Sequence, residues 1–272
     1  MAREESRPAL PSTLYDKDYF LTACEGHEEF INTQGEHLSR RLSEAFAVAS
    51  VEPGMRVLDV GCGRGEIVCH CARLGADAYG IDYAEVAVDL SQELIQSAGG
   101  PVPGQMGVYQ ADAKRLPFPG GVFDRALMFD VVEHLYPWEL EAAMAEVKRV
   151  LKSGGMFVVH TAPNRWYDVY AYPVVRLIRT LQGKGHLYPI NPRALNVAIN
   201  QDVHVNEQDM VSLRRNLKRA GFGNIKVWLN TPRNALYQRE QWPFKLARHI
   251  VFHWPPFRWF FEREVFAVAV KV

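Results

Sequence analysis

The sequence predicts an α/β fold with a doubly wound, mostly parallel β-sheet. Short apolar runs with β-branched members alternate along the chain with segments of helical periodicity, as in strands joined by crossover helices. The first strand is predicted at Val57–Val60, where the apolar residues suit burial on both faces of a parallel sheet. It leads into a glycine-rich turn from Gly61 to Gly65 and then into a helix from Glu66 to Leu74.

The glycine-rich turn predicts a cradle for a nucleotide cofactor. Gly61, Gly63 and Gly65 can adopt positive φ and let a ligand lie against bare backbone. The helix that follows has unpaired N–H groups at its start. Such a turn alone also fits a purely structural connection in an α/β protein, so the assignment depends on a second observation.

The second observation is a carboxylate at the end of the next predicted strand, Ala78–Asp82. Asp82 follows Gly63 by 19 positions, close to the offset of roughly 20 residues at which an acid binds ribose hydroxyls in dinucleotide-binding folds. The two oxygens of a carboxylate suit a vicinal diol. The sequence therefore predicts a cofactor that contains ribose.

The spacing of the glycines indicates which cofactor this is. The dinucleotide fingerprint needs a glycine three positions after Gly63, where this chain has Glu66, an anion that disfavours a pyrophosphate at the helix start. Instead Asp59 precedes the turn, and an acid followed by G-x-G-x-G resembles motif I of the class I S-adenosylmethionine-dependent methyltransferases. The resemblance implies that S-adenosyl-L-methionine lies along the glycine backbone and that Asp59 helps to hold its amino-acid end.

Further segments resemble the same family in the same order. Met106–Gln110 is predicted as the third strand, and the resemblance implies that Asp112 accepts a hydrogen bond from the adenine amino group while the Ala113 N–H donates to the ring. The loop Leu116–Asp124 and the turn Arg149–Gly155 resemble family segments as well. The remaining residues expected to bind the cofactor are Cys62, Tyr83, Phe129 and Asp130.

The resemblance also sharpens the expected fold. It places the chain with the type 11, UbiE/UbiG-like small-molecule methyltransferases. It implies a Rossmann-like sheet of seven strands, with the last strand, Val265–Val272, inserted antiparallel between strands five and six. Residues 1–50 are expected to form a helical lid, and residues 51–272 the methyltransferase domain, with insertions at about 165–204 and 230–261.

Two histidines at predicted strand ends are candidates for catalysis, because ligands in open α/β sheets bind outside the carboxyl ends of strands. His134 follows the fourth strand, Phe123–Val131, and neutral imidazole can accept a proton near pH 7. Alternatively, Glu133 and His134 pair with each other and only shape the loop. His160 ends the fifth strand, and both it and Asn164 either contact the methyl acceptor or brace the loop.

The N-terminal segment offers candidates for the lid. A helix is predicted from Gly35 to Val48 by its apolar stripe. Arg40 or Arg41 would anchor the carboxylate of the cofactor. Aromatic side chains of the same segment either cover the cofactor or pack the helix on the core; they are Tyr15, Tyr19 and Phe20.

The two insertions are less regular. The first contains a predicted helix at Val169–Leu181, and a later helix is expected to open near His204 with Asn206 as its N-cap. His204 either faces the acceptor or has a capping or solvated role. The second insertion, rich in tryptophan, phenylalanine and arginine, walls an apolar acceptor pocket, lies on a membrane surface or partner subunit, or packs on the core. Core packing plus pocket wall is the favoured interpretation.

Composition excludes several classes of protein. The 272 residues carry 31 basic and 31 acidic side chains, so no global charge points to nucleic acid. No secretory h-region and no run of 18 apolar residues occurs, which makes the cytoplasm the expected location. Cys69 and Cys71 would point about 200° apart on a helix and lack zinc spacing, so no metal is predicted.

The sequence thus predicts an enzyme that moves a methyl group from S-adenosyl-L-methionine by in-line displacement to an O, N or C nucleophile. The expected acceptor is a small molecule, apolar if the second insertion walls its pocket, and the expected state is a monomer or homodimer. Two alternatives are an RNA-modifying methyltransferase, which should show a basic groove, and a non-catalytic interaction module with the same cofactor fold.

Overall fold

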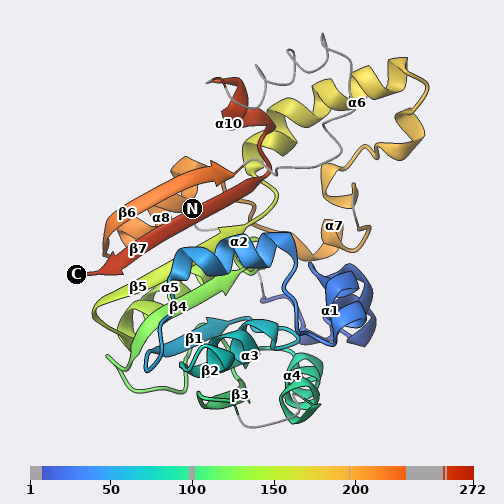
Figure 1. Ribbon diagram of the computed structural model, residues 1–272. Helices are drawn as coiled ribbons and strands as arrows, with labels where there is room; N and C mark the ends of the chain where they lie inside the picture. The colour runs from blue at the N-terminus through green and yellow to red at the C-terminus, as the bar shows by residue number, and fades with distance from the viewer. Residues whose placement is uncertain (1–7, 98–101, 196, 231–253, 255) are drawn as a thin grey trace.

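The computed structural model describes residues 8–97, 102–195, 197–230, 254 and 256–272. Its centre is a seven-stranded sheet with the strand order β3-β2-β1-β4-β5-β7-β6 (Figure 1). The strands are β1 (Arg56–Val60), β2 (Asp77–Asp82), β3 (Met106–Gln110), β4 (Phe123–Phe129), β5 (Leu151–Thr161), β6 (Phe222–Asn230) and β7 (Glu264–Lys271). The predicted fold class is confirmed.

Helices cover both faces of the sheet (Figure 1). Apolar side chains of α2 and α3 pack in one core cluster, and those of α5 and α8 pack in the other. The described helices are α1 (His27–Thr33), α2 (Arg40–Ala49), α3 (Glu66–Arg73), α4 (Glu85–Ser97), α5 (Pro137–Val150), α6 (Tyr172–Leu181), α7 (Asn200–Val203), α8 (Met210–Arg219) and α10 (Phe257–Phe261). Both faces of the central strands are therefore buried, as their nearly continuous apolar runs require.

The last strand closes the sheet as expected. β7 pairs antiparallel with β5, from Met156 opposite Val270 to Thr161 opposite Val265. Its other edge pairs antiparallel with β6, while β1 to β5 are parallel to one another. The parallel strands therefore end at one edge of the sheet, where the site must lie.

Several predicted boundaries were wrong at the ends of elements. The helix expected from Gly35 begins at Arg40, because the Ser39 hydroxyl accepts from the Leu42 N–H (3.3 Å) and acts as its N-cap. The strand expected to reach Val131 ends at Phe129, since Asp130 has a left-handed φ of 54°. A strand cannot continue through that conformation.

The later helices also begin elsewhere than predicted. α8 begins at Met210 rather than near His204, because the Asp209 carboxylate accepts from the N–H groups of Val211 and Ser212 (both 2.8 Å). Asn206 is therefore not its N-cap. In the first insertion a π-helical turn at Tyr167–Ala171 precedes α6.

The second insertion lies mostly outside the described residues, since 231–253 and 255 are not described. Its expected roles as pocket wall or core packing therefore remain predictions. Within the ranges that the structure describes, no helix has both the length and the apolarity needed to cross a membrane.

Candidate active site

The glycine-rich turn is held tightly against β2 and the loop after β4. The N–H groups of Gly61 and Cys62 donate to the Ile81 carbonyl at 2.8 and 3.0 Å. Gly61 has φ of 77°, and a Cβ there would lie 2.4 Å from Cγ2 of Val131. Only glycine fits this position, so the backbone of the turn stays exposed to a ligand.

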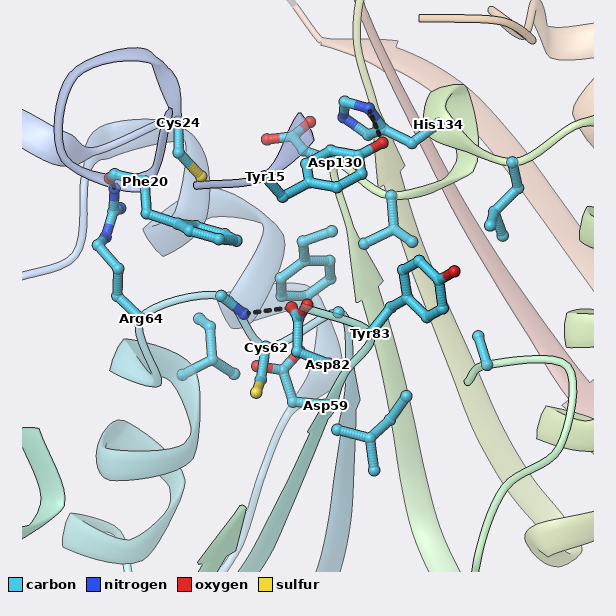
Figure 2. A pocket seen from close by; sticks show the side chains of 18 of the residues that line it. Tyr15, Phe20, Cys24, Asp59, Cys62, Arg64, Asp82, Tyr83, Asp130 and His134 are labelled. Atoms are coloured by element: carbon cyan, nitrogen blue, oxygen red, sulfur yellow. Dashed lines mark hydrogen bonds between the residues drawn. The ribbon is translucent and has the colours of Figure 1, made fainter. Parts of the chain in front are cut away.

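Asp82 organises the turn from the end of β2 (Figure 2). Its Oδ2 accepts from the Gly63 N–H and its Oδ1 from the Ala84 N–H, both at 3.0 Å. Burial nevertheless raises the pKa of Asp82 above its ordinary value, against the lowering effect of these backbone donors. The carboxylate lines a cavity beside the turn and retains acceptor capacity toward a ligand.

The cavity lies at the carboxyl ends of β1, β2 and β4, between the glycine-rich turn and the N-terminal segment (Figure 2). Twelve of the fifteen site residues predicted from sequence line it. They are Tyr19, Asp59, Gly61, Cys62, Gly63, Asp82, Tyr83, Asp112, Ala113, Phe129, Asp130 and His134. Gly65, Arg41 and His160 do not line it.

Asp59 is a buried acid of the cavity, 4% exposed near the end of β1. Burial first, and then the negative charges of Asp82 and Glu66, raise its pKa to about 8. A carboxyl group in this state favours a cationic partner, because a positive charge would offset the burial that disfavours its ionised form.

Gly65 has a packing role. Its φ is 84°, and a Cβ there would lie 2.9 Å from the Cβ and Oγ of Ser91 on α4. The Ser91 hydroxyl donates to the Gly63 carbonyl at 2.8 Å. Gly65 thus lets α4 approach the turn and shapes the cavity without contacting its contents.

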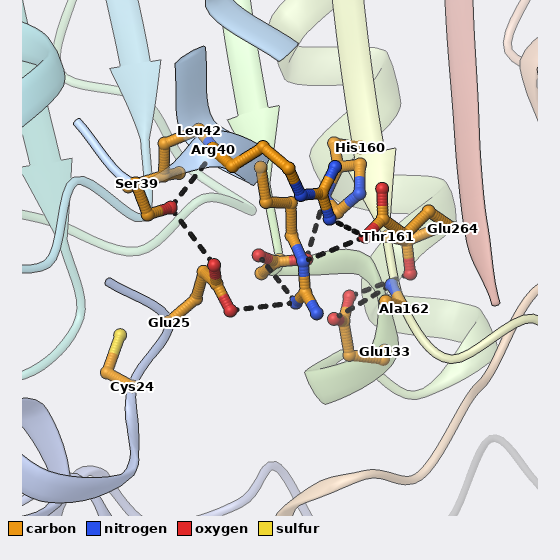
Figure 3. A network of polar contacts seen from close by, with 12 residues as sticks. Cys24, Glu25, Ser39, Arg40, Leu42, Glu133, His160, Thr161, Ala162 and Glu264 are labelled. Carbon is orange, nitrogen blue, oxygen red and sulfur yellow. Dashed lines mark hydrogen bonds and ion pairs between the residues drawn. The ribbon is translucent and has the colours of Figure 1, made fainter. Parts of the chain in front are cut away.

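Arg41 and His160 both pair with Asp130 in a polar network, part of which, including His160 and Glu264, is labelled in Figure 3. Nδ1 of His160 is 2.8 Å from Oδ1 of Asp130, and Nη1 of Arg41 is 3.5 Å from Oδ2. The Asp130 N–H also donates to the His160 carbonyl at 3.0 Å. His160 is fully buried, so it reaches the cavity only through Asp130.

The same network crosses the sheet to its last strand. Arg40 donates to Glu264 of β7 at 2.6 Å, and Nε of Arg41 lies 3.6 Å from the same carboxylate.

Burial would raise the pKa of Asp130, but the charges of His160 and Arg41 outweigh the effect of burial and hold that pKa well below its ordinary range. Asp130 is therefore a fixed anion at the cavity wall.

His134 lies on the short helical turn after β4, between the N-terminal segment and the first insertion. Its Nδ1 is 3.1 Å from the Val203 carbonyl and 3.3 Å from the Tyr15 hydroxyl. A carbonyl only accepts, so the geometry assigns the proton to Nδ1 and leaves Nε2 unprotonated. Burial lowers the pKa of His134 to about 4, which keeps the ring neutral at pH 7.

Glu133 does not pair with His134, contrary to the alternative drawn from sequence. Its Oε2 accepts from the Thr161 hydroxyl at 2.8 Å, and its Oε1 lies 3.4 Å from the Ala162 N–H. Burial, followed by the charge of Asp130, raises the pKa of Glu133 to about 8. Glu133 joins the loops after β4 and β5.

One alternative from sequence gave His204 a capping or solvated role. The structure shows neither of these roles. The buried ring of His204 lies 4.9 Å from the His134 ring, between centroids, and burial lowers its pKa to about 3. Within the described ranges, ligand atoms of Glu133, His134 and His204 lie within 4.8 Å of one another, close enough to hold a metal ion. Glu133 is already hydrogen-bonded to Thr161 in this arrangement, and the prediction of no metal remains a prediction.

Asn164 braces the loop after β5, the second of its two expected roles. Its side-chain amide donates to the carbonyls of Trp259 and Glu262, both at 2.9 Å. The amide is thereby used within the fold and is fully buried.

Sequence reasoning assigned no role to Arg64, which lies between Gly63 and Gly65 in the glycine-rich turn. It is 2% exposed, and its guanidinium donates to the Phe20 carbonyl at 2.6 Å and the Glu25 carbonyl at 2.5 Å (Figure 2). It also donates to Glu66 at 3.0 Å. Arg64 thus fastens the N-terminal segment over the cavity, through partners so distant in sequence that no local pattern indicates them.

Comparison with known proteins identifies the chemistry of this site. Residues 58–159 match the family model described as a methyltransferase domain. This match spans β1, the glycine-rich turn, Asp82, Asp112 and the loop after β4, so it covers the whole cofactor side of the cavity. The chain is therefore similar to the class I S-adenosylmethionine-dependent methyltransferases and carries a methyltransferase domain. S-adenosyl-L-methionine is accordingly the methyl donor of the enzyme.

Relatives of this methyltransferase are named as C-methyltransferases and as O-methyltransferases. The "Ubiquinone/menaquinone biosynthesis C-methyltransferase UbiE" of Shewanella halifaxensis is 26% identical over 198 residues, which are 68% of this chain and 74% of the relative. The "Ubiquinone biosynthesis O-methyltransferase" of Rhizobium rhizogenes is 33% identical over 139 residues, which are 50% of this chain and 53% of the relative.

Solved structures confirm the fold of the methyltransferase. An S-adenosylmethionine-dependent methyltransferase from Mesorhizobium loti has a TM-score of 0.58 at 18% identity, covering 85% of this chain and 98% of that one. The [4+2]-cyclase SpnF has a TM-score of 0.61 at 18% identity, covering 97% and 98%. At this identity the likeness concerns the fold alone.

Proposed function

We propose that this methyltransferase moves the methyl group by in-line displacement onto an O, N or C nucleophile of a small molecule. The observation that carries the proposal is one cavity in which Asp59, Asp82 and the glycine backbone face aromatic and imidazole groups of Tyr15, Tyr19 and His134. The donor and the acceptor would therefore meet between two chemically distinct walls.

The cofactor wall is assigned by the chemistry of its groups. Asp82 would bind the ribose hydroxyls and Asp59 the cationic amino group of S-adenosyl-L-methionine, because each acid offers an acceptor in the cavity. Asp112 and the Ala113 N–H would bind the adenine ring. The remaining proposed cofactor contacts are Tyr19, Gly61, Cys62, Gly63, Tyr83, Phe129 and Asp130.

Three of the predicted site residues would act on the cavity only indirectly. Arg41 and His160 would be positioning residues, because they hold the Asp130 carboxylate by ion pairs of 3.5 and 2.8 Å behind the cavity wall. Gly65 would have the same indirect role through the approach of Ser91. A methyl acceptor would touch none of the three.

His134 is the proposed general base. Its ring is neutral at pH 7, and the hydrogen bond from Nδ1 to Val203 leaves Nε2 able to take a proton from an acceptor hydroxyl or ammonium group. S-adenosyl-L-methionine supplies an electrophilic methyl group on a sulfonium. Orientation and exclusion of water by the N-terminal segment can contribute about 7–11 kcal/mol in well-held cases.

The acceptor is proposed to be apolar and ring-bearing. Apolar and aromatic side chains line the cavity together with His134; they are Leu10, Tyr15, Tyr19, Phe20, Val131 and Leu135. The rings of Tyr15 and Tyr19 lie 5.6 and 6.5 Å from that of His134, between centroids. Relatives named for ubiquinone and menaquinone biosynthesis and for sterol methylation support this choice. The neutral overall charge gives no support to an RNA substrate.

One experiment tests the proposal. The purified protein is incubated with S-adenosyl-L-methionine carrying a labelled methyl group and with a fractionated extract of small molecules, and labelled products are identified by mass spectrometry. We expect label in an apolar product with the wild type and at least tenfold less with His134→Ala. Tight cofactor binding in calorimetry without transfer to any fraction would refute the proposal and support a non-catalytic module.

A further inference from the structure

A group of exposed apolar side chains projects from the first insertion. On α6, Leu177 is 60% exposed and Leu181 is 80% exposed. Residues 177 and 181 are one helical turn apart and share a face of α6. We call this group the cap surface; its members are Val174, Leu177, Ile178 and Leu181 on α6, Leu187 and Ile190 after it, and Phe257 and Trp259 on α10.

The cap surface lies apart from the cavity. α6 and α10 extend beyond the end of the sheet in Figure 1. α10 packs against the π-helical turn before α6, with the rings of Tyr170 and Phe260 5.3 Å apart, and the cavity is lined by neither helix. The exposed apolar residues are therefore not used in the proposed methyl transfer.

The part of the first insertion that carries most of the cap surface has charged side chains of one sign. The segment from Val169 to Leu195 contains four cations and no acid, although the whole chain has 31 basic and 31 acidic residues. Two of these cations, Arg179 and Lys184, are paired with no carboxylate among the described residues; Arg179 donates to Gln182 at 3.0 Å. Exposed leucine and aromatic side chains with cations nearby are the composition that lies in the interface of an anionic membrane.

We infer that the cap surface docks the enzyme reversibly on the surface of a membrane that contains anionic lipids. Leucine, isoleucine and aromatic side chains would enter the boundary between headgroups and acyl chains, while Arg179 and Lys184 would stay at the phosphate level. A second copy of this chain is a poorer occupant, because a two-fold interface would place the same cations against one another.

The inference is tested by flotation of the full chain with vesicles. We expect the wild type to bind vesicles of phosphatidylcholine mixed with phosphatidylglycerol, to bind those of phosphatidylcholine alone far less, and to be released by salt. The variant Leu177→Ser/Leu181→Ser should lose at least roughly tenfold in partitioning. The matched control is Leu74→Ser/Val211→Ser, which removes apolar side chains that are 44% and 50% exposed elsewhere, and it should bind as the wild type does.

A second variant keeps the test decisive if the first fails to fold. Arg179→Gln/Lys184→Gln leaves the apolar side chains in place and should weaken binding to the mixed vesicles severalfold. Unaltered circular dichroism and cofactor binding would show that each variant is folded. The inference is overturned if the wild type ignores mixed vesicles, if folded variants bind like the wild type, or if sedimentation shows a dimer that Leu177→Ser/Leu181→Ser abolishes. These outcomes do not depend on the proposed acceptor.

Discussion

The two walls of the cavity are built in different ways. The cofactor wall takes Asp59, the glycine-rich turn and Asp82 from one stretch of β1, α3 and β2, joined by short backbone hydrogen bonds. The acceptor wall joins Tyr15 and His134, which are 119 positions apart, and the Val203 carbonyl holds His134 from outside the cavity. The first wall is a local motif, whereas the second exists only in the complete fold.

This contrast has a chemical side. The acids of the cofactor wall keep acceptor oxygens for a ligand even though burial raises their pKa. The imidazole of the acceptor wall, His134, is kept neutral because burial lowers its pKa, and burial also lowers the pKa of the neighbouring His204. A wall of acceptors suits a cationic nucleoside, and a wall with a neutral base suits an acceptor that must lose a proton. Substitutions in one wall at a time can test this comparison.

The largest expected effect is at the cofactor wall. Asp82→Ala should weaken S-adenosyl-L-methionine binding by about tenfold to a hundredfold, because it removes an acceptor and leaves the N–H groups of Gly63 and Ala84 without their partner. Isothermal titration calorimetry measures this loss. Asp77→Ala, at the other end of β2, is the control and should bind normally. Unchanged affinity of Asp82→Ala would remove the ribose assignment.

The acceptor wall should respond in turnover instead. His134→Ala is expected to lower kcat by about tenfold to a hundredfold with little change in cofactor affinity, because His134 lies across the cavity from Asp82 (Figure 2). Once an acceptor is identified, initial rates give kcat and calorimetry gives the affinity. His37→Ala, which removes an exposed histidine, should be neutral. Full activity of His134→Ala would exclude its role as base.

Arg64 joins the glycine-rich turn to the N-terminal segment, so its loss should affect the order of that segment. Arg64→Ala is expected to weaken cofactor binding by roughly three- to tenfold and to speed tryptic cleavage after Lys17, since the carbonyls of Phe20 and Glu25 lose their donor. Limited proteolysis followed by mass spectrometry checks the second effect. Arg56→Ala, with an exposed side chain, should match the wild type. Equal cleavage rates in both variants would contradict the fastening role.

The smallest expected effect concerns pH. The Asp59 carboxyl keeps its proton in the folded state up to about pH 8 but loses it near 3.8 when unfolded. Its stabilising contribution is therefore complete below the ordinary pKa and is lost as pH rises through 8. The free energy of unfolding of Asp59→Asn should therefore fall less between pH 5 and 8 than that of the wild type.

Urea unfolding of the cofactor-free protein at both pH values measures that change. Glu133 has a pKa raised in the same direction, so part of the fall should remain in Asp59→Asn. Asp77→Asn is the matched control. A fall of the same size in the wild type and in Asp59→Asn would contradict the assignment.

The sequence predicted the cofactor wall well because the relevant information is local. The strand, the turn and the 19-residue step to Asp82 lie in one short segment, and the structure brings these residues to one cavity. The insertion of β7 was predicted from family resemblance and is confirmed by its antiparallel pairing with β5 and β6.

The acceptor wall and the polar network were only partly predicted, because their partners are distant. The contact between Arg40 and Glu264 spans 224 positions, and that of Arg64 with Phe20 spans 44. The N-cap was predicted at Asn206, whereas Asp209 caps the helix and forms a reciprocal capping box with Ser212 three positions later. Here a local signal was present and was not used.

The position of β7 has a consequence for biosynthesis. β6 precedes β7 in the chain, yet β7 lies between β5 and β6 in the sheet. During translation β6 therefore emerges before the strand that will bind it, and β5 has an unpaired edge for the same interval. Exposed strand edges invite pairing with other chains. A nascent or prematurely terminated chain without residues 264–271 should therefore be a substrate for chaperones rather than a smaller version of the enzyme.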